Sequence, residues 1–372
     1  WNFDLKDQLD HVDDGANDEN QALVTDGSPV SNLDLSSILT VTDEDGDTAT
    51  GAATGAFVIN IVDDVPIAAV EPRGISATVE EDDMTGVPGG DLSTGNNEDG
   101  SVDQDEAAGA AGSIAPLFSM GSDEPGGNYG ITEDGSILGN LTTLYSKGDA
   151  VSYSSNGSTL TATAGGRDVF TFTVNSDGSW NFDLKDQLDH VDDGANDENQ
   201  ALVTDGSPVS NLDLSSILTV TDEDGDTATG AATGAFVINI VDDVPAAVLQ
   251  PAAIVGSVLE DGLSETSGDA GDLSEGIRES GESLTSDEDS GSSNPLDPSN
   301  LSHLFESGAD EPITSYGITT DPSALATLDT LYSHGEQLNY SVTQGVSADT
   351  LTATSTSGTV FTLTVNHDGS WN

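Results

Sequence analysis

The sequence predicts an all-β protein, built as tandem immunoglobulin-like β-sandwich domains in an extended array. Three observations predict this class: a long exact internal repeat, apolar residues that alternate with threonine, and frequent turn dipeptides among 42 glycines. Alternation with a period of two is typical of half-buried strands, and short strands separated by turns are typical of a sandwich. We find no convincing amphipathic helical pattern.

The repeat sets the expected domain organisation. Residues 1–66 recur letter for letter as residues 180–245, and Trp371 and Asn372 begin the block a third time. A fixed long period indicates copies of one folded unit joined end to end. We therefore expect residues 1–66 to be the C-terminal part of a repeat, 67–245 to be a complete repeat, and 246–372 to be the N-terminal part of the next repeat.

Two further expectations follow from comparing the copies. Length differences between the copies fall in two places, the acidic segment 84–113 (262–300 in the next copy) and the polar turn near Ser154–Ser158, and such variation marks surface loops. A strand edge that lacks its partner is a template for pairing with another chain. We therefore expect either poorly ordered terminal fragments or head-to-tail association, in which residues 246–372 of one chain complete residues 1–66 of the next.

The strands are predicted from local patterns. Val169–Val174 and Trp180–Leu184 alternate around the turn residues Asn175–Ser179, which predicts a β-hairpin with one buried face. Further strands are expected at Ile38–Thr42 and Phe57–Val62, which flank an acidic loop, with weaker signals at Ala77–Val79 and Thr159–Thr163. Short helical turns are expected at Leu5–Leu9 and Leu35–Leu39.

The charge balance excludes several partners. Six Lys and Arg stand against 68 Asp and Glu, a formal net charge of −62. Nucleic acid and anionic membrane surfaces both need clustered cations, so neither is expected as a partner. Self-repulsion of this size destabilises a compact state, which points to small multivalent cations as counter-ions. Without cysteine, disulfides and thiolate metal sites are excluded, and no apolar run is long enough to span a membrane.

The strongest candidate site is the loop Asp43-Glu44-Asp45-Gly46-Asp47, repeated at 222–226. Carboxylates at alternate positions of a turn converge on one point while glycine relieves the backbone, and Ca²⁺ takes six to eight hard oxygen ligands. The loop is not an EF-hand, because glycine stands at its fourth position and Thr54 at its twelfth. The predicted calcium ligands here are Asp43, Asp45, Asp47, Asp222, Asp224 and Asp226; a solvated acidic turn is the alternative.

A second candidate site lies at the junction between repeats. Asp63 and Asp64 precede a proline that stiffens the junction, and Glu81 and Asp82 lie shortly into the next unit. Acidic residues on both sides of a linker can share calcium ions and fix the angle between domains. The copies of these candidates are Asp242, Asp243, Glu260 and Asp261. The alternative is a plain polar linker. Asp13, Asp14, Asp18 and Glu19 form a third, weaker cluster.

Other residues suggest ordinary structural roles. His11 and His190 stand beside carboxylates, but a single histidine in this context is more often a surface polar residue than a metal ligand. Trp1 and Trp180 are expected in the core or hairpin. Paired carboxylates can hydrolyse glycosides, but 68 acidic residues produce such pairs by chance. No enzymatic activity is therefore expected.

The motifs also resemble a known family. The order is Val-Phe-Thr-(Phe/Leu)-Thr-Val-Asn-x-Asp-Gly-Ser-Trp, then Leu-Asp-His, Thr-Asp-Glu-Asp-Gly-Asp-Thr-Ala and Ile-Asn-Ile-Val-Asp-Asp-Val-Pro. It resembles the tandem repeats of giant repeats-in-toxin (RTX) adhesins, exported by bacterial type I secretion, over the whole chain. The resemblance implies extracellular, calcium-stiffened extender domains, with calcium on Asp43, Asp45, Asp47, Asp63, Asp64 and their copies. The glycine-rich nonapeptides that name the toxin family are absent from the sequence.

We therefore expect a non-enzymatic spacer of a bacterial cell-surface adhesin, with calcium ions and neighbouring repeats as partners. The rival is a ligand-binding module for carbohydrate, ice or peptide. Such a module needs an exposed aromatic or regular threonine-rich face, whereas aromatic residues make up only 5% of this chain and mostly fit strand interiors.

Overall fold

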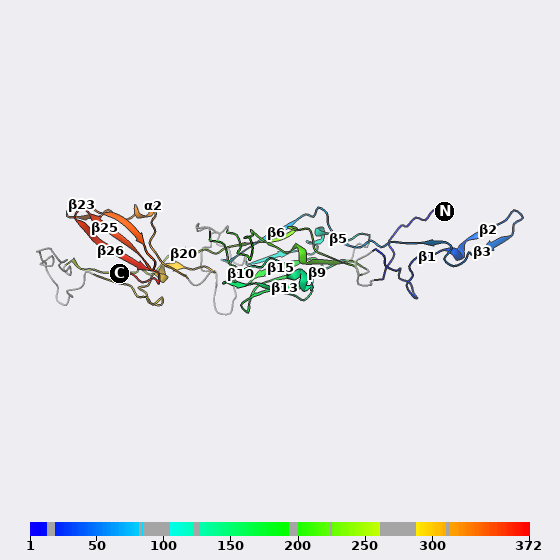
Figure 1. Cartoon of the computed structure of the whole chain (residues 1–372), viewed down its shortest axis with the longest axis horizontal. Coiled ribbons are helices and arrows are strands. Elements are labelled where there is room, and N and C mark those ends of the chain that lie inside the picture. Colours follow the sequence, from blue (N-terminus) through cyan, green and yellow to red (C-terminus); the bar gives the residue numbers. More distant parts are fainter. Residues whose placement is uncertain are drawn as a thin grey trace. The chain divides into compact units, whose positions relative to one another are not determined.

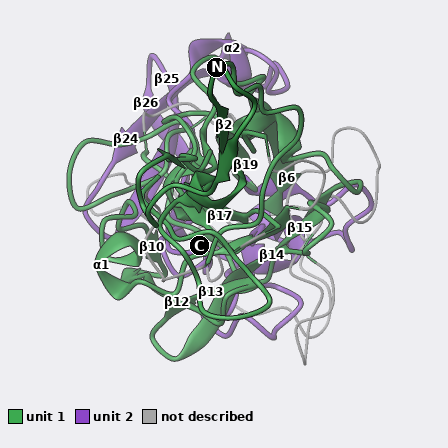
Figure 2. Ribbon diagram, turned by 90° about the vertical axis from the view of Figure 1, so that its right-hand side faces the viewer, with its two compact units in different colours: residues 1–93, 97–243 green, residues 94–96, 244–372 purple. Residues whose placement is uncertain are grey.

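The structure is a computed structural model that describes residues 1–12, 19–81, 84, 105–122, 127–192, 200–223, 225–260, 288–309 and 313–372. The chain divides into two compact units (Figure 2): unit 1 is residues 1–93 and 97–243, and unit 2 is residues 94–96 and 244–372. The all-β prediction is confirmed. Among the described residues the α-helices are the single turns α1 (Gly135–Leu138) and α2 (Pro322–Leu325), beside short 3-10 turns.

The two copies of the repeated block pair their strands in the same register. In residues 1–66, β1 pairs with β4 and β2 with β3; in residues 180–245, β16 pairs with β19 and β17 with β18. The bounds are β1 (Leu33–Asp34), β2 (Thr40–Thr42), β3 (Thr48–Thr50), β4 (Val58–Ile59), β16 (Leu212–Asp213), β17 (Leu218–Thr221), β18 (Thr227–Thr229) and β19 (Phe236–Val241).

Strand β19 is longer than β4 although the two have the same sequence. The difference is a partner: β6 (Ile75–Glu80) pairs in parallel with the whole of β19, and Val79, its second-last residue, is fully buried. Backbone groups that gain a ladder partner are held extended, whereas the same groups in β4 remain solvated. The predicted strand Phe57–Val62 is thus complete only in its second copy.

The main sheet of unit 1 has the order β12-β13-β14-β15-β7. The predicted hairpin is confirmed as β14 and β15, and Gly178 provides the positive φ of 77° that its turn needs. The bounds are β7 (Glu106–Gly109), β12 (Ser152–Ser155), β13 (Thr159–Ala164), β14 (Arg167–Val174) and β15 (Trp180–Leu184). Shorter strands complete the unit (Figure 1): β5 (Ile67–Ala68), β8 (Phe118–Ser119), β9 (Asn128–Ile131), β10 (Tyr145–Ser146) and β11 (Asp149–Ala150).

The core lies where the main sheet packs against the β16-β19-β6 sheet. The ring of Phe236 on β19 has its centroid 5.0 Å from Phe172 on β14 and 5.0 Å from Trp180 on β15. All three side chains are buried. Aromatic rings at such distances contribute beyond their buried area. Trp180 therefore belongs to the core, as the sequence predicts.

Unit 2 contains a three-stranded sheet of the same kind. Its order β24-β25-β26 repeats β12-β13-β14, with a register shift at Ala353/Thr354 that matches the one at Ala162/Thr163. The bounds are β20 (Ala246–Ala247), β21 (Phe305–Glu306), β22 (Tyr332–Ser333), β23 (Glu336–Gln337), β24 (Asn339–Gln344), β25 (Ala348–Ser355) and β26 (Gly358–Asn366), and β25 and β26 lie side by side in Figure 1.

The helical turn expected at Leu35–Leu39 is present as a 3-10 turn at Ser36–Ile38, whereas the described backbone of Leu5–Leu9 is not helical. The immunoglobulin-like topology and the repeat boundaries remain predictions. Most of the two acidic segments, 84–113 and 262–300, lies outside the described residues. Within the described part of the chain, no helix has the length and apolar character needed to cross a bilayer.

The identical blocks provide a matched test of the core. Phe236→Ala removes a fully buried ring and is expected to cost about 3–5 kcal/mol of unfolding free energy. Phe57→Ala is the same change at a half-buried position of the first block, so its cost should be much smaller. Urea unfolding of both variants checks this. Equal losses would show that the partner strands do not create the core.

Candidate metal centres

The loop of the first block brings its alternate carboxylates together. Asp43 Oδ1 accepts a hydrogen bond of 2.9 Å from the Asp47 backbone N–H, and the Asp43 N–H donates to the Asp47 carbonyl at 3.0 Å. Gly46 has a φ of 98°, where a side chain would be strained. One oxygen from each of Asp43, Asp45 and Asp47 lies within 4.8 Å of the others, and all three residues are exposed. The convergence expected from alternate spacing is therefore present.

These hydrogen bonds keep the loop anionic. The side chain of Asp45 and then the backbone N–H of Asp47 lower the pKa of Asp43 below its ordinary value. The loop therefore carries negative charge at neutral pH, which a hard cation requires.

The second copy of the loop is buried. Asp222 Oδ1 accepts from the N–H groups of Gly225 at 3.0 Å and Asp226 at 2.8 Å, and both Asp222 and Asp226 are almost inaccessible. Asp224 lies outside the described residues. A charged carboxylate is costly to bury, so a counter-charge would stabilise this copy more than the exposed one.

The first block covers this buried loop. Gln21 Nε2 donates a hydrogen bond to Asp226 Oδ1, across 205 residues of sequence. Asp63 and Asp64 of the first block also make contacts. The Asp63 N–H donates to the Glu19 carbonyl at 3.4 Å, and Asp64 Oδ2 accepts from Ser122 Oγ at 3.3 Å. We call Asp63, Asp64, Asp222 and Asp226 the junction cluster, although, unlike Asp43, Asp45 and Asp47, these described residues do not bring three ligand oxygens within 4.8 Å of one another. Its carboxylates come from two successive copies of the block.

A second cluster lies just after the C-terminal end of β6. Because Glu80 is in register with Val241 in the parallel pair, the next residues on each strand, Glu81 and Asp242, become neighbours. His190 joins them, and one ligand atom from each of Glu81, His190 and Asp242 lies within 4.8 Å of the others. We call these three residues the end cluster.

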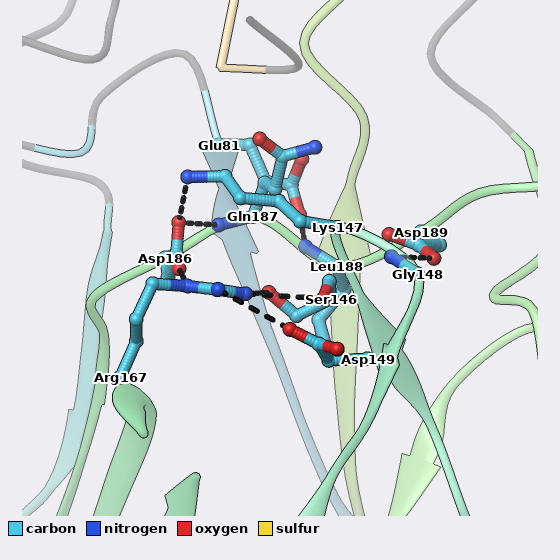
Figure 3. A network of polar contacts seen from close by, with 10 residues as sticks. All are labelled: Glu81, Ser146, Lys147, Gly148, Asp149, Arg167, Asp186, Gln187, Leu188 and Asp189. Carbon is cyan, nitrogen blue, oxygen red and sulfur yellow. Dashed lines mark hydrogen bonds and ion pairs between the residues drawn. The ribbon is translucent and has the colours of Figure 1, made fainter. Parts of the chain in front are cut away.

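The end cluster is anchored by backbone groups. Glu81 Oε1 accepts a 2.7 Å hydrogen bond from the N–H of Leu188 (Figure 3). His190 Nδ1 lies 3.0 Å from the Leu188 carbonyl and 3.3 Å from Asp242 Oδ1. The first block repeats the pair, with His11 Nδ1 3.0 Å from Asp63 Oδ1. The expectation of surface histidines is wrong: both side chains are buried against a carboxylate.

The junction grouping expected from the sequence also changes. The expected group was Asp63 and Asp64 with Glu81 and Asp82. In the structure Glu81 lies instead beside Asp242, after the C-terminal end of β6. Asp82 and Asp261 lie outside the described residues, as do Asp13, Asp14 and Asp18 of the third cluster. Asp243 is buried next to Asp242, and Glu260 is exposed in unit 2.

Two basic side chains contact Asp186, two residues before Leu188 in the chain. Asp186 receives Lys147 Nζ at 2.7 Å and Arg167 Nε at 2.7 Å, and Arg167 also donates to the Ser146 carbonyl at 3.1 Å (Figure 3). The hydrogen bond to Asp186 is the main cause that raises the pKa of Arg167. Two of the chain's six basic residues thus neutralise this one carboxylate.

Burial perturbs the end cluster. It raises the pKa of Asp242 from 3.8 to about 6, and the backbone N–H of Asp243 offsets only part of this effect. Neutral pH therefore forces a charge onto a buried group, and a bound cation would relieve that cost.

The spacing and chemistry of the ligand atoms suit a cation. Calcium–oxygen distances are about 2.3–2.6 Å, so two ligands on opposite sides of one ion are at most about 5 Å apart. The Asp43-Asp45-Asp47 set meets this limit with oxygen atoms alone, and the end cluster meets it with two carboxylates and an imidazole. Residues of both groups therefore fit a divalent ion, and the all-oxygen set fits calcium.

The comparisons with known proteins assign no function. Residues 92–233 match the family described as "Domain of unknown function (DUF5801)". That range covers the main sheet and the buried acidic loop, and is less than half of the chain. No curated protein and no solved structure matches the chain.

The pKa of Asp242 predicts a pH effect in a metal-free sample, screened by monovalent salt. A folded-state pKa of about 6 lies above the ordinary 3.8, so the native state holds the proton more tightly than the unfolded state. This stabilisation is complete below pH 4 and is lost as the pH rises through 6, a change of roughly 3 kcal/mol. Asp242→Asn removes the titration, so the melting temperature of the variant relative to wild type should rise between pH 4 and 7. A constant difference would contradict the assignment.

Proposed function

We propose that this chain consists of calcium-stabilised extender repeats of a large bacterial surface adhesin. Each repeat is an immunoglobulin-like sandwich, and the array holds a ligand-binding region away from the cell. The role is extracellular and structural, without catalysis. The resemblance to RTX adhesin repeats supports the class of protein, and the exact repetition of residues 1–66 supports a role that gains from length.

One observation carries the proposal: the junction cluster draws its carboxylates from two copies of the block. Gln21 of the first copy binds Asp226 of the second, and Asp63, Asp222 and Asp226 are all buried. Burying charged carboxylates is costly unless opposite charge and hydrogen bonds compensate them. Divalent cations that bind both sides of the boundary would remove this cost and hold the copies together.

The rival ligand-binding role receives less support. Its hallmark is an exposed aromatic platform, whereas the aromatic residues of the unit 1 core are buried and the exposed Trp1, Phe305 and Tyr332 come from three separate segments of the chain. The identical block also preserves exposed and buried positions alike, which suggests recent duplication rather than a surface shaped for one ligand.

The first test is calcium-dependent order. At low ionic strength with chelator, the carboxylates repel and the chain should be loose or unfolded. At millimolar Ca²⁺ it should fold, because extracellular calcium modules bind with Kd of roughly 10⁻⁴–10⁻³ M. Circular dichroism and calorimetric titration follow both states. A melting temperature unaffected by chelator would refute the calcium proposal.

The second test concerns stiffness at the junction. In saturating calcium, the variant D63N/D64N/D222N/D226N should broaden the distance distribution in small-angle scattering, because it removes ligands on both sides of one boundary. The matched control is D43N/D45N/D47N, which alters the exposed loop of the first block and should leave the distribution unchanged. If both variants scatter like the wild type, the junction is not held by shared ions.

A further inference from the structure

The end cluster differs chemically from the exposed acidic loop because one of its ligand atoms is a nitrogen. Glu81, His190 and Asp242 each bring one ligand atom within 4.8 Å of the others, whereas the loop of residues 43–47 offers oxygens alone. Calcium takes oxygen ligands, whereas imidazole is a favoured ligand of zinc and other late first-row transition ions. The two groups therefore suit different classes of cation.

The ligands of the end cluster are withdrawn from solvent. Glu81 is fully buried, and the side chains of His190 and Asp242 are 2% and 7% exposed. Asp242 Oδ1 lies 3.3 Å from His190 Nδ1 and accepts no hydrogen bond from the described residues. A buried carboxylate oxygen without a hydrogen bond is costly, and an ion bound beside it would remove this cost. This oxygen points to an occupant independently of the composition of the cluster.

A proton alone does not balance the charge of this part of the unit. A proton on His190 would supply one positive charge against three buried carboxylates, at Glu81, Asp242 and Asp243. The two basic side chains of the neighbouring network are already paired with Asp186 (Figure 3). A divalent ion supplies two charges at the place where the ligand atoms converge.

The backbone holds the ligands in place before an ion binds. The parallel ladder of β6 and β19 sets Glu81 beside Asp242, and the Leu188 N–H donates to Glu81 Oε1 at 2.7 Å. His190 forms a bridge with Leu202, and its Nδ1 lies 3.0 Å from the Leu188 carbonyl. Histidines that bind metals are typically oriented by a backbone carbonyl or a carboxylate of this kind. A site assembled in advance loses little conformational entropy on binding.

The first block repeats two thirds of the group. His11 and Asp63 are the copies of His190 and Asp242, with Nδ1 3.0 Å from Oδ1 and side chains that are 3% and 2% exposed. The third ligand comes from outside the block, because Glu81 follows β6. The histidine–aspartate pair is therefore encoded by the block, and a glutamate from the start of the folded segment completes it in unit 1.

We propose that the end cluster binds a divalent first-row transition ion, with Zn²⁺ as the best match, in preference to calcium. Two carboxylate oxygens and one imidazole nitrogen are ligand types of protein zinc sites. The ion would join the ends of β6 and β19 to the segment that follows β15. One repeat would thus hold two classes of cation, calcium at its all-oxygen loop and a transition ion at the end cluster. This assignment stands whether or not the loop binds calcium.

Calorimetric titration of the full chain with Zn²⁺, at pH 7 in millimolar Ca²⁺, tests the assignment. Wild type should bind a tight equivalent that His190→Gln binds at least about a hundredfold more weakly, because loss of an outer-shell partner alone costs about 10–100-fold. His303→Gln is the matched control, since His303 is exposed in unit 2, and it should bind as wild type. His11→Gln is titrated separately, so that an equivalent held by the first block is counted apart.

A direct measurement on wild type covers the case in which His190→Gln does not fold. In saturating calcium, the ring nitrogen resonances of His190 should move when Zn²⁺ is added and stay in place when the calcium concentration is doubled. Wild type that binds no tight Zn²⁺, or His190 resonances that ignore Zn²⁺, would overturn the proposal. A folded His190→Gln variant with full affinity would do the same. A chain whose folding ignores calcium would refute the calcium proposal alone and leave this one standing.

Discussion

Buried carboxylates are the constraint on which unit 1 depends. Asp222 and Asp226 lie in the loop between β17 and β18, Glu81 follows β6, Asp242 and Asp243 follow β19, and all five are buried. The chain has only six basic residues, and two of them are engaged by Asp186. Burial penalises the charged form of these carboxylates, so the cations that we propose would stabilise the packed core at neutral pH. This charge balance links the composition, the packing of the sheets and the proposed calcium dependence.

The two copies of the block separate local from tertiary effects. Both form the acidic hairpin loop, the Asp–Ser turn and the His–Asp pair, so these features are encoded locally. Strand length and burial are not local: β4 has two residues where β19 has six. The parallel partner β6 makes this difference, and it is contributed by residues outside the block.

This distinction also explains what the sequence could predict. The all-β class and the β14–β15 hairpin follow from alternation and turn residues close together in the chain, and so does the convergence of Asp43, Asp45 and Asp47. The contact of Gln21 with Asp226 and the meeting of Glu81 with Asp242 depend on pairings across more than 150 residues, which no local pattern contains. The burial of His190 was misjudged because its partner Asp242 lies 52 residues later in the same block, beyond the reach of a local pattern. The copy His11 is buried against Asp63 in the same way, and the repeated Asp-His-Val-Asp-Asp context was a signal.

The parallel pairing of β6 with β19 has a mechanical consequence. These are among the first and last strands of the segment 67–243, and they run in the same direction side by side. Tension applied through the chain on either side would pull β6 towards its start and β19 towards its end. The six residue pairs between Ile75–Glu80 and Phe236–Val241 would then be loaded in shear at the same time, rather than separated one after another from one end. A parallel pair loaded in shear resists mechanical unfolding. The core that it covers would therefore stay packed until all the hydrogen bonds between β6 and β19 break together.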